Sequence, residues 1–467
     1  MNITFLIGNG FDVNLGIKSR YIDFYKDYVK SVSVDDRACI QRFKKEINDF
    51  IKSNCRKSED SAIDWRDLEV ALGAWTERLQ KDEAEPLYID IIDGLRDYLI
   101  KEYSYFDAEA FTKDDLLNYL LDPINRNFSR TQIETLRNFW DTFSGQDEIN
   151  IISFNYTDTI EQLLGFKGER ILLGYNFAGR KTYLNSVKHI HQTLADEEIL
   201  LGLNDMSQIA NADFHKDRHI CNLLIKPMTN TLLGTGIDQD CETIISNTHL
   251  FVLFGTSAGI TDRKWWKSVC NRLHADNVRL LYFIYCPDDV KHVRIKYDVM
   301  SESAFSAFLK SAAVKEDTVF ESLFSKSFLC FKSDLFKLQP NYRGRIPSLK
   351  TLRINNSDVT IRVQDMAFRY ISLFVDAPDE KTGVAAERKW IAEFFPGFKE
   401  EMQSLNHYKV GDKHVPFDQI SFSYKGIKKD IYFDISSFFG KDDNYKIAAI
   451  PMNSKVAAFS NTIKKLY

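Results

Sequence analysis

Four short segments carry residues whose types and spacing could do chemistry. They cover residues 8–12 (Gly-Asn-Gly-Phe-Asp), 153–158 around Asn155, 189–192 (His-Ile-His-Gln) and 254–262 (Phe-Gly-Thr-Ser-Ala-Gly-Ile-Thr-Asp). Each lies at or directly after an apolar run that is short enough for a buried strand. Because ligands of open α/β sheets bind at the carboxyl ends of the strands, these segments predict one polar site at a sheet edge.

Glycines in the first segment would let the backbone approach a phosphate, whose charge amide groups and a helix N-terminus can meet. A dinucleotide-binding fingerprint would require a third glycine at position 13, where this chain has Val13. The alternative is a tight turn. In the fourth segment, small residues with free amides and hydroxyls could hold a ribose or phosphate, and we expect Asp262 to cap the following helix.

Asn155 follows a predicted strand, and its amide can both donate to a carbonyl and accept from a ribose hydroxyl or a water. The alternative is that Asn155 only shapes a turn before a helix. Asp158 and Glu161 have the spacing of a capping box, which predicts a helix that continues through Leu163.

Two histidines, His189 and His191, are two residues apart, so on a strand both imidazoles could share a face. A metal pair, a general base with a neighbour, and ordinary polar strand residues are the three interpretations. A metal pair needs further ligands, and His215 and His219 do not form a HExxH motif. The near-neutral pKa of histidine suits a general base.

The elements that must position these residues are strands and helices of an α/β fold. Apolar runs predict buried strands at residues 3–7, 148–154, 186–191, 249–254 and 278–285, with 199–203 as a further strand that pairs with 186–191. Aromatic residues at helical spacing predict a helix from Tyr21 to Tyr28. The pattern from about 35 to 145 is helical and predicts an insertion between the first two strands. Trp265 and Trp266 are expected in the core.

After about residue 325 the pattern changes to alternating apolar and polar residues, at 359–363, 420–424 and 431–435. This alternation is typical of antiparallel strands with one solvated face. We therefore predict two domains, with a boundary near residues 325–345. Residues 1–325 form an α/β domain with a parallel sheet and the helical insertion at 35–145, and residues 326–467 form a smaller α+β region.

Composition narrows the class of protein. Among 467 residues, 61 Lys and Arg stand against 66 Asp and Glu, a formal charge of −5, which argues against a polycationic nucleic-acid binder. Seven cysteines without a CxxC spacing indicate neither a disulfide framework nor a zinc ribbon. Without a basic N-terminal region or an apolar run of ~18 residues, we expect no signal peptide and no membrane span. The expected location is the cytoplasm.

Taken together, the four segments resemble those of the AbiH family of bacterial abortive-infection proteins. That family opens with a strand and a Gly-Asn-Gly-Phe-Asp turn, here residues 8–12, followed by a Tyr/Phe-rich helix, here 21–28. It also carries a Phe-Asn-Tyr-Thr element, a histidine turn and a glycine-serine turn ending in Asp, here 154–157, His191 and 255–262. The likeness covers about residues 1–300.

The same order resembles, more distantly, the Sir2-like NAD-binding fold, whose last turn matches Gly255-Thr256-Ser257. That resemblance implies a Rossmann-like sheet and NAD⁺ hydrolysis, with Asn155 positioning the ribose or a water and His191 as base. It implies cofactor binding by Gly8, Asn9, Gly10, Asp12, Gly255, Thr256 and Ser257, and no metal. Gln192 stands where both families usually have glycine, Asn9 replaces the usual sirtuin alanine, and the missing zinc cysteines argue against a deacetylase.

The expected function is thus an antiphage effector that hydrolyses NAD⁺, responds to a phage-derived trigger or a defence partner, and assembles as a homo-oligomer. A nucleotide-binding sensor or scaffold without turnover is the alternative. A nuclease is a third option, based on dispersed acids at Asp12, Asp205 and Asp262 that lack a clear metal-binding spacing.

Overall fold

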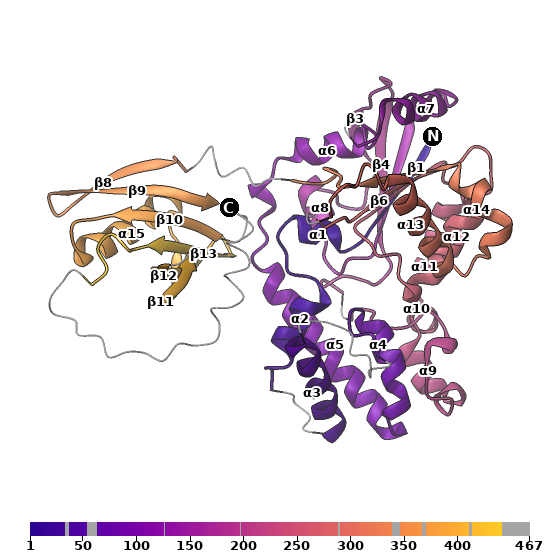
Figure 1. Ribbon diagram of the computed structural model, residues 1–467, viewed down its shortest axis with the longest axis horizontal. Coiled ribbons are helices and arrows are strands. Elements are labelled where there is room, and N and C mark those ends of the chain that lie inside the picture. The colour runs from indigo at the N-terminus through magenta and orange to yellow at the C-terminus, as the bar shows by residue number, and fades with distance from the viewer. Residues whose placement is uncertain are drawn as a thin grey trace. The chain divides into compact units, whose positions relative to one another are not determined.

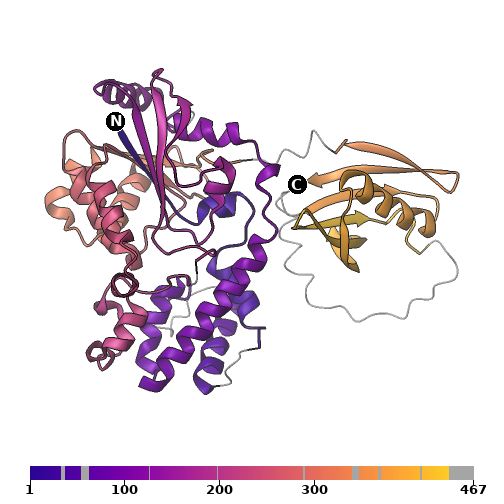
Figure 2. The same ribbon diagram turned by 180° about the vertical axis from the view of Figure 1, so that it is seen from behind.

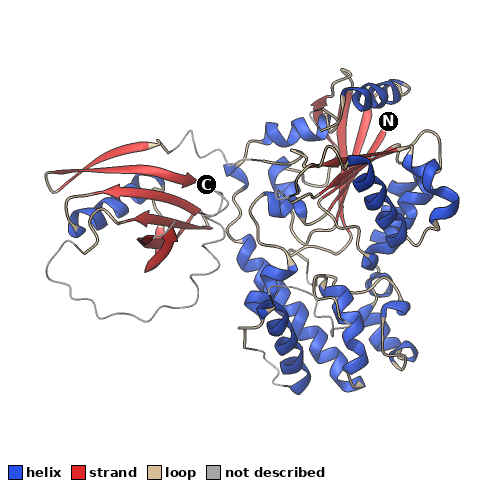
Figure 3. Ribbon diagram, viewed as in Figure 1, coloured by secondary structure: helices blue, strands red, loops and turns tan. Residues whose placement is uncertain are grey.

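The computed structural model describes residues 1–32, 37–53, 63–125, 127–196, 198–287, 290–338, 346–366, 370–410 and 413–440. The chain divides into two compact units (Figure 1). The first comprises Met1–Glu102 and Lys113–Leu338, and the second comprises Tyr103–Thr112 and Gln339–Tyr467. Figure 3 shows that helices and a sheet make up the first unit and that strands predominate in the second.

A seven-stranded, mostly parallel sheet forms the centre of the first unit, in the order β3-β4-β2-β1-β5-β6-β7. Only β3 is antiparallel to its neighbour, β4. The strands are β1 (Asn2–Ile7), β2 (Asp147–Ser153), β3 (Ile171–Tyr175), β4 (Lys181–His189), β5 (Leu250–Phe254), β6 (Arg279–Ile284) and β7 (Ser327–Phe331). The predicted α/β class with a parallel sheet is confirmed.

The strand order reverses at β1. From β1 the chain adds β2 and then β4 on one side, and it crosses back to add β5, β6 and β7 on the other. The central strands are buried on both faces; Phe5, Leu6 and Leu253 are at most 1% exposed, which is why their sequences lack alternation. The turns after β1 and β5 therefore meet at the switch point of the sheet.

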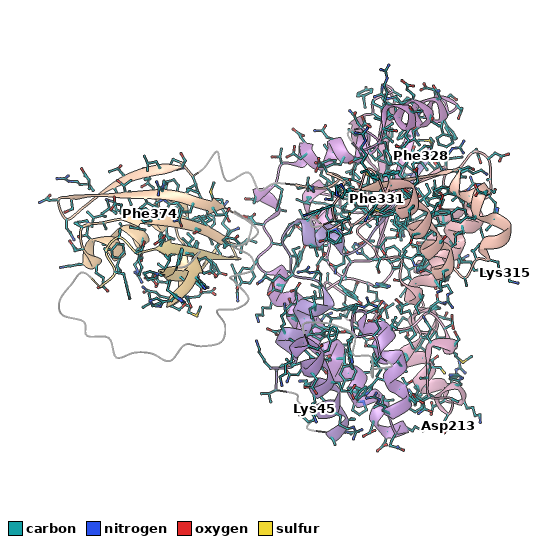
Figure 4. The ribbon with its side chains drawn as sticks, in the orientation of Figure 1. Lys45, Asp213, Lys315, Phe328, Phe331 and Phe374 are labelled. Atoms are coloured by element: carbon teal, nitrogen blue, oxygen red, sulfur yellow. The ribbon has the colours of Figure 1, made fainter. Side chains whose placement is uncertain are left out.

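One prediction about strands is wrong. Residues 199–203 are not a strand; Leu203 forms only an isolated bridge with Ile225, and the segment buries its side chains among helices. Strand β7 begins at Ser327 and pairs with β6, so the first unit continues to Leu338. Figure 4 shows Phe328 and Phe331 on this strand.

Helices complete the first unit. Figures 1 and 2 show α2, α3, α4, α5 and α9 gathered at one end of the unit, away from β3. Their interior is aromatic, with Phe43, Trp65 and Trp75 in mutual contact. The helices before residue 325 are α1 (Gly10–Asn14), α2 (Tyr21–Tyr28), α3 (Ala38–Lys52), α4 (Leu68–Trp75), α5 (Lys81–Tyr103), α6 (Lys113–Leu121), α7 (Arg130–Asp141), α8 (Thr159–Leu164), α9 (Arg218–Leu224), α10 (Lys226–Leu233), α11 (Ile237–Ser246), α12 (Arg263–Leu273), α13 (Tyr297–Ser311) and α14 (Glu316–Phe324).

The second unit is a six-stranded sheet in the order β11-β12-β13-β10-β9-β8, with β10 and β13 parallel and the other pairs antiparallel. The alternating segments predicted at 359–363 and 420–424 lie in β9 and β12, and most of 431–435 lies in β13. Helix α15 (Glu380–Phe394) packs against β8, β9 and β10. The strands are β8 (Leu349–Ile354), β9 (Ser357–Met366), β10 (Tyr370–Asp376), β11 (Lys399–Val410), β12 (Lys413–Tyr424) and β13 (Ile427–Asp434).

The two adjacent tryptophans and the described cysteines are buried. Trp265 and Trp266 are core residues, 5% and 0% exposed. Six cysteines are free and buried, and Cys55 lies outside the described residues. Within the described part of the chain, no helix has the length and apolar character needed to span a membrane.

Candidate functional site

The turns after β1 and β5 are packed directly against each other. The amide of Gly8 donates to the Phe254 carbonyl at 2.9 Å, and that of Gly10 donates to the Gly255 carbonyl at 2.7 Å. A Cβ added at Gly10 would lie 2.5 Å from the Gly255 Cα, and Gly255 has φ +70°. These glycines permit the close approach of two backbones. In this conformation the amides of Gly8 and Gly10 are not available to a phosphate.

The other predicted cofactor-binding residues around these turns differ in their surroundings. Asn9 exchanges two hydrogen bonds with Ser19, through the Ser19 hydroxyl and carbonyl. Thr256 accepts from the Ala258 amide, and Ser257 is exposed. Ser257 is therefore the predicted cofactor contact that solvent reaches most easily.

Phe336, in the segment after β7, covers the same end of the sheet. Its ring lies 5.3 Å from that of Phe11 and 5.0 Å from that of Phe254, and its carbonyl accepts from Asn14. Phe336 is fully buried, with φ +56°. An aromatic side chain on the segment that ends the first unit thus fills space beside the switch point.

Asp12, at the start of α1, connects the first turn to the turn after β2. Its Oδ2 accepts from the Thr157 hydroxyl at 2.5 Å, and its Oδ1 accepts from the Thr159 hydroxyl at 2.8 Å. Asp12 is 1% exposed. Burial raises the pKa of its carboxyl to about 6, against the opposing effect of the two hydroxyls and of His189.

Asn155 lies beside Asp12, and its side chain is the least satisfied polar group of the region. It is 4% exposed, and neither Nδ2 nor Oδ1 has a hydrogen-bond partner among the described residues. The amide lowers the pKa of Asp12 from nearby but does not reach hydrogen-bond geometry with it. A buried, unpaired amide lowers the free energy of unfolding by ~1–3 kcal/mol, and such groups are rare in native proteins.

His189, the last residue of β4, supports the Asn155 backbone. Its Nδ1 lies 3.0 Å from the Asn155 carbonyl and its Nε2 lies 2.7 Å from Oε1 of Glu161. Burial alone would lower the pKa of His189, but the Glu161 carboxylate, the Asn155 carbonyl and Asp12 raise it above its ordinary value. We call these six residues the Asn155 cluster: Asp12, Asn155, Thr157, Thr159, Glu161 and His189.

A second group of buried charges surrounds Lys226, at the start of α10. The Lys226 ammonium lies 3.0 Å from both carboxylate oxygens of Glu69 and 2.8 Å from Oδ1 of Asp262. It also lies 3.1 Å from Nε2 of His191. We call these four residues, Glu69, His191, Lys226 and Asp262, the Lys226 cluster.

The charges of the Lys226 cluster stabilise one another. Burial alone would lower the pKa of Lys226, but Asp262 and Glu69 raise it above its ordinary value. Burial alone would raise the pKa of Asp262, but Lys226 and His191 hold it well below its usual range. Lys226 and Asp262 are thus held in the charged state although both are largely buried.

Both ring nitrogens of His191 have protein partners. Nδ1 lies 3.2 Å from the Phe154 carbonyl, which can only accept, so Nδ1 carries a hydrogen. A neutral ring then accepts from Lys226 at Nε2, and a protonated ring donates from Nε2 to Asp262 at 3.0 Å. In either state no nitrogen of His191 is available to a substrate without rearrangement of the cluster.

The structure therefore separates the two predicted catalytic residues. The side chain of Asn155 belongs to one cluster and that of His191 to the other, and among the described residues they share no hydrogen bond. β4 ends at His189, so the histidine pair does not share a strand face as expected. The next turn places Gln192 at φ +60°, a conformation that favours the glycine of the family pattern.

Two predicted helix caps are wrong. Asp158 precedes α8 without a side-chain cap, and Glu161 binds His189 instead of closing a capping box. Asp262 precedes α12 without capping it, because its carboxylate binds Lys226 and His191. Interactions with distant segments engage Glu161 and Asp262, whereas Asp158 accepts a hydrogen bond from Gln162 within the same helix.

Two cavities adjoin the clusters. An open groove of about 480 Å³ is lined by His189, Gln192 and Thr193, with Lys188, Asp196, Glu198, Val187, Leu233, Thr235 and Ile237. A small polar cavity of about 10 Å³, which has room for about one water molecule, is lined by His191, Lys226 and Asp262 together with Asn204, Asn230, Asp238 and others. His189 lines the groove and also binds the Asn155 carbonyl, so the His189 side chain lies between the groove and Asn155.

The three acids considered for metal binding, Asp12, Asp205 and Asp262, do not belong to one cluster. Within the described ranges, no group of three or more His, Cys, Asp or Glu side chains is arranged to hold a metal ion. Asp205 accepts hydrogen bonds from Asn204 and Ser207 at a short 3₁₀ turn. Asp12 belongs to the Asn155 cluster and Asp262 to the Lys226 cluster.

Sequence reasoning did not identify Glu69 and Lys226. Glu69 was recognisable as one acid within the apolar segment Leu68–Trp75, where a charge implies a buried partner. Lys226, directly before Pro227, gave no comparable signal. The pairing of Thr157 and Thr159 with Asp12 joins residues 145 and 147 positions apart, which no local pattern reveals.

The fold and these clusters define a mixed α/β protein with buried polar groups at the carboxyl ends of its central parallel strands. Residues 4–284 match the model of the family described as bacteriophage abortive infection AbiH. Because the match covers more than half of the chain, the protein belongs to the AbiH family, which indicates a role in abortive infection by bacteriophage. The search of curated proteins gave no match.

Proposed function

We propose that this protein is an abortive-infection effector that hydrolyses NAD⁺ to nicotinamide and ADP-ribose, with Asn155 at the reacting centre. The unpaired, buried amide of Asn155 at the carboxyl end of β2 is the observation that carries the proposal. An amide in that position can hold a ribose hydroxyl or the attacking water, and such positioning contributes strongly to hydrolysis.

The sheet supports this proposal. Its parallel strands run in the order β4-β2-β1-β5-β6-β7, which is the order of doubly wound sheets that bind dinucleotides across the switch point. The groove beside His189 has a volume in the range of small-molecule sites, ~300–1,000 Å³. Similarity to Sir2-like proteins, as noted from the sequence, adds NAD⁺ as the substrate and His191 as the base.

The direct test measures nicotinamide release from NAD⁺ by the purified full chain, with and without lysate of phage-infected cells as the source of a trigger. Asn155→Ala should abolish release, and His191→Ala tests the base role. Asn150→Ala, on the same strand β2, is the matched control and should retain release. If both Asn155→Ala and His191→Ala turn over NAD⁺ like the unmodified protein, this mechanism is wrong.

A nucleotide sensor without turnover is the second candidate. It is favoured by the pairing of both His191 nitrogens and by the engaged amides of Gly8 and Gly10. Retention of NAD⁺ or a related nucleotide in equilibrium dialysis, with no nicotinamide released in the presence of trigger, would favour this function over hydrolysis.

A further inference from the structure

Asp12 has the features of a proton acceptor next to the Asn155 amide. Each carboxylate oxygen has one hydroxyl donor, Thr157 or Thr159, and an oxygen of a carboxylate can accept about two hydrogen bonds. Each oxygen therefore retains capacity for a further donor such as water. Glu161 differs in its partner: its Oε1 binds the His189 ring, and its Oε2 has no hydrogen-bond partner among the described residues.

The unpaired amide of Asn155 is the second, independent observation. It lies beside Asp12, is 4% exposed, and has no partner for either its donor or its acceptor atom among the described residues. A water held between this amide and the Asp12 carboxylate would satisfy both groups. The two side chains therefore form half of a site that a ligand or water completes.

We propose that Asp12, rather than His191, is the catalytic base of this site and takes the proton of the water that attacks the substrate. The inference rests on the proposed function, because it requires a reaction in which water is the nucleophile. His191 then belongs to the charge network that holds α4, α10 and the turn before α12 together.

The step balances without a further reactant. The water oxygen forms a bond to C1′ of the nicotinamide ribose, and the bond from C1′ to the pyridinium nitrogen breaks. The electron pair of that bond goes to the ring nitrogen and neutralises its charge. The water proton goes to the Asp12 carboxylate, which later releases it to solvent.

The surroundings of Asp12 suit this role. The pKa of its carboxyl, raised to about 6 by burial, leaves it ionised at neutral pH and close to the optimum for a base. Among the described residues, His189 on β4 is the titratable group that acts on Asp12, and Glu161 on α8 is bound to that histidine. Thr157 and Thr159 face it with hydroxyls, which lower its pKa.

The test is the pH dependence of nicotinamide release by the full chain, with trigger lysate present. Asp12→Asn should reduce kcat by about 100-fold or more, the range of general-base catalysis. Thr157→Val keeps the carboxylate but removes a donor that lowers its pKa, so the acid limb of the profile should move to higher pH. Asp67→Asn is the control, since Asp67 also has a pKa raised to about 6 but caps α4, where Asn serves equally.

The outcomes are distinguishable. Loss of turnover in Asp12→Asn together with the shift in Thr157→Val, and a normal profile in Asp67→Asn, would support Asp12 as the base. Turnover in Asp12→Asn within about threefold of the unmodified protein, or an unmoved acid limb in Thr157→Val, would overturn the inference and leave NAD⁺ hydrolysis standing.

If Asp12→Asn does not fold, the pH profile of Thr157→Val decides between these outcomes. No nicotinamide release by the unmodified protein would overturn the proposed function, and this inference with it.

Discussion

The Asn155 cluster and the Lys226 cluster adjoin the same turn, residues 154–157, but they bury their polar groups in opposite ways. In the Lys226 cluster each charge faces an opposite charge, and four side chains share one network. In the Asn155 cluster an amide and the Oε2 of Glu161 are buried and have no hydrogen-bond partner in the described part of the chain. Satisfied networks specify a fold, whereas unsatisfied polar groups occur where a ligand completes the site.

The comparison implies that the Lys226 cluster contributes to stability and the Asn155 cluster to function. Four predictions test this difference by measuring the free energy of unfolding, from the largest expected effect to the smallest.

Lys226→Met should destabilise the first unit most, by about 3–5 kcal/mol, because it leaves the carboxylates of Glu69 and Asp262 buried without a cation. Urea unfolding followed by tryptophan fluorescence gives the measurement. Lys264→Met is the control: its ion pairs with Asp238 and Glu242 are partly exposed, and its loss should cost about 1 kcal/mol or less. Equal losses of unfolding free energy in Lys226→Met and Lys264→Met would show that the Lys226 cluster does not contribute more to stability than an exposed ion pair.

Asp12→Asn should change the pH dependence of stability. A carboxyl whose folded pKa is raised to about 6 binds its proton in the folded state at pH values where the unfolded chain has released it. The protein therefore loses stability as pH rises from about 4 to 6, by about 3 kcal/mol for this group. Asp12→Asn should remove that loss. The free energy of unfolding of the variant, relative to that of the unmodified protein, should therefore be higher at pH 7 than at pH 4. A pH-independent difference would contradict the burial of an ionisable carboxyl here.

His189→Gln should reduce stability by about 1–2 kcal/mol, chiefly at low pH. The folded pKa of His189 is raised, so its stabilisation is fully present below the unfolded value, ~6.5, and is lost as pH rises through the folded pKa. Glu161→Gln removes the carboxylate that pairs with this ring and should reduce the same pH dependence. If unfolding midpoints of His189→Gln and the unmodified protein differ equally at pH 5 and pH 9, the ion pair is not the cause.

Asn155→Leu should have the smallest effect on folding. The substitution removes two unpaired polar atoms and keeps a similar volume, so stability should stay within about 1 kcal/mol or increase. Nicotinamide release should be lost at the same time. A loss of stability comparable to that of Lys226→Met would show that Asn155 is a structural residue.

Much of the fold could be predicted from short apolar runs. The segments 3–7, 148–154, 249–254 and 278–285 correspond to β1, β2, β5 and β6, because strands buried on both faces require continuous apolar sequence. The segment 199–203 is just as apolar but packs among helices, since burial in a helical core requires the same residues as a buried strand. Local composition cannot separate these two environments.

The site was predictable to a smaller extent. Turns at the carboxyl ends of strands do bring Asp12, Asn155 and Gly255 to the switch point of one sheet. The partners of these residues were not predictable, because Asp12 binds Thr157 and Thr159 and Lys226 binds Glu69 across long intervals of sequence. The predicted cap at Asp262 is wrong because its carboxylate binds Lys226 and His191, which are distant in sequence.

The sequence by itself thus determined the α/β class, the family and the end of the sheet at which polar residues collect, because these depend on residue order and local burial. The tertiary structure alone decided which polar groups are paired. It assigned His191 to a closed network around Lys226 and left the amide of Asn155, beside Asp12, without a hydrogen-bond partner among the residues that the structure describes. The physical reason is that hydrogen bonds and ion pairs depend on distances of about 3 Å, which only the packed chain sets.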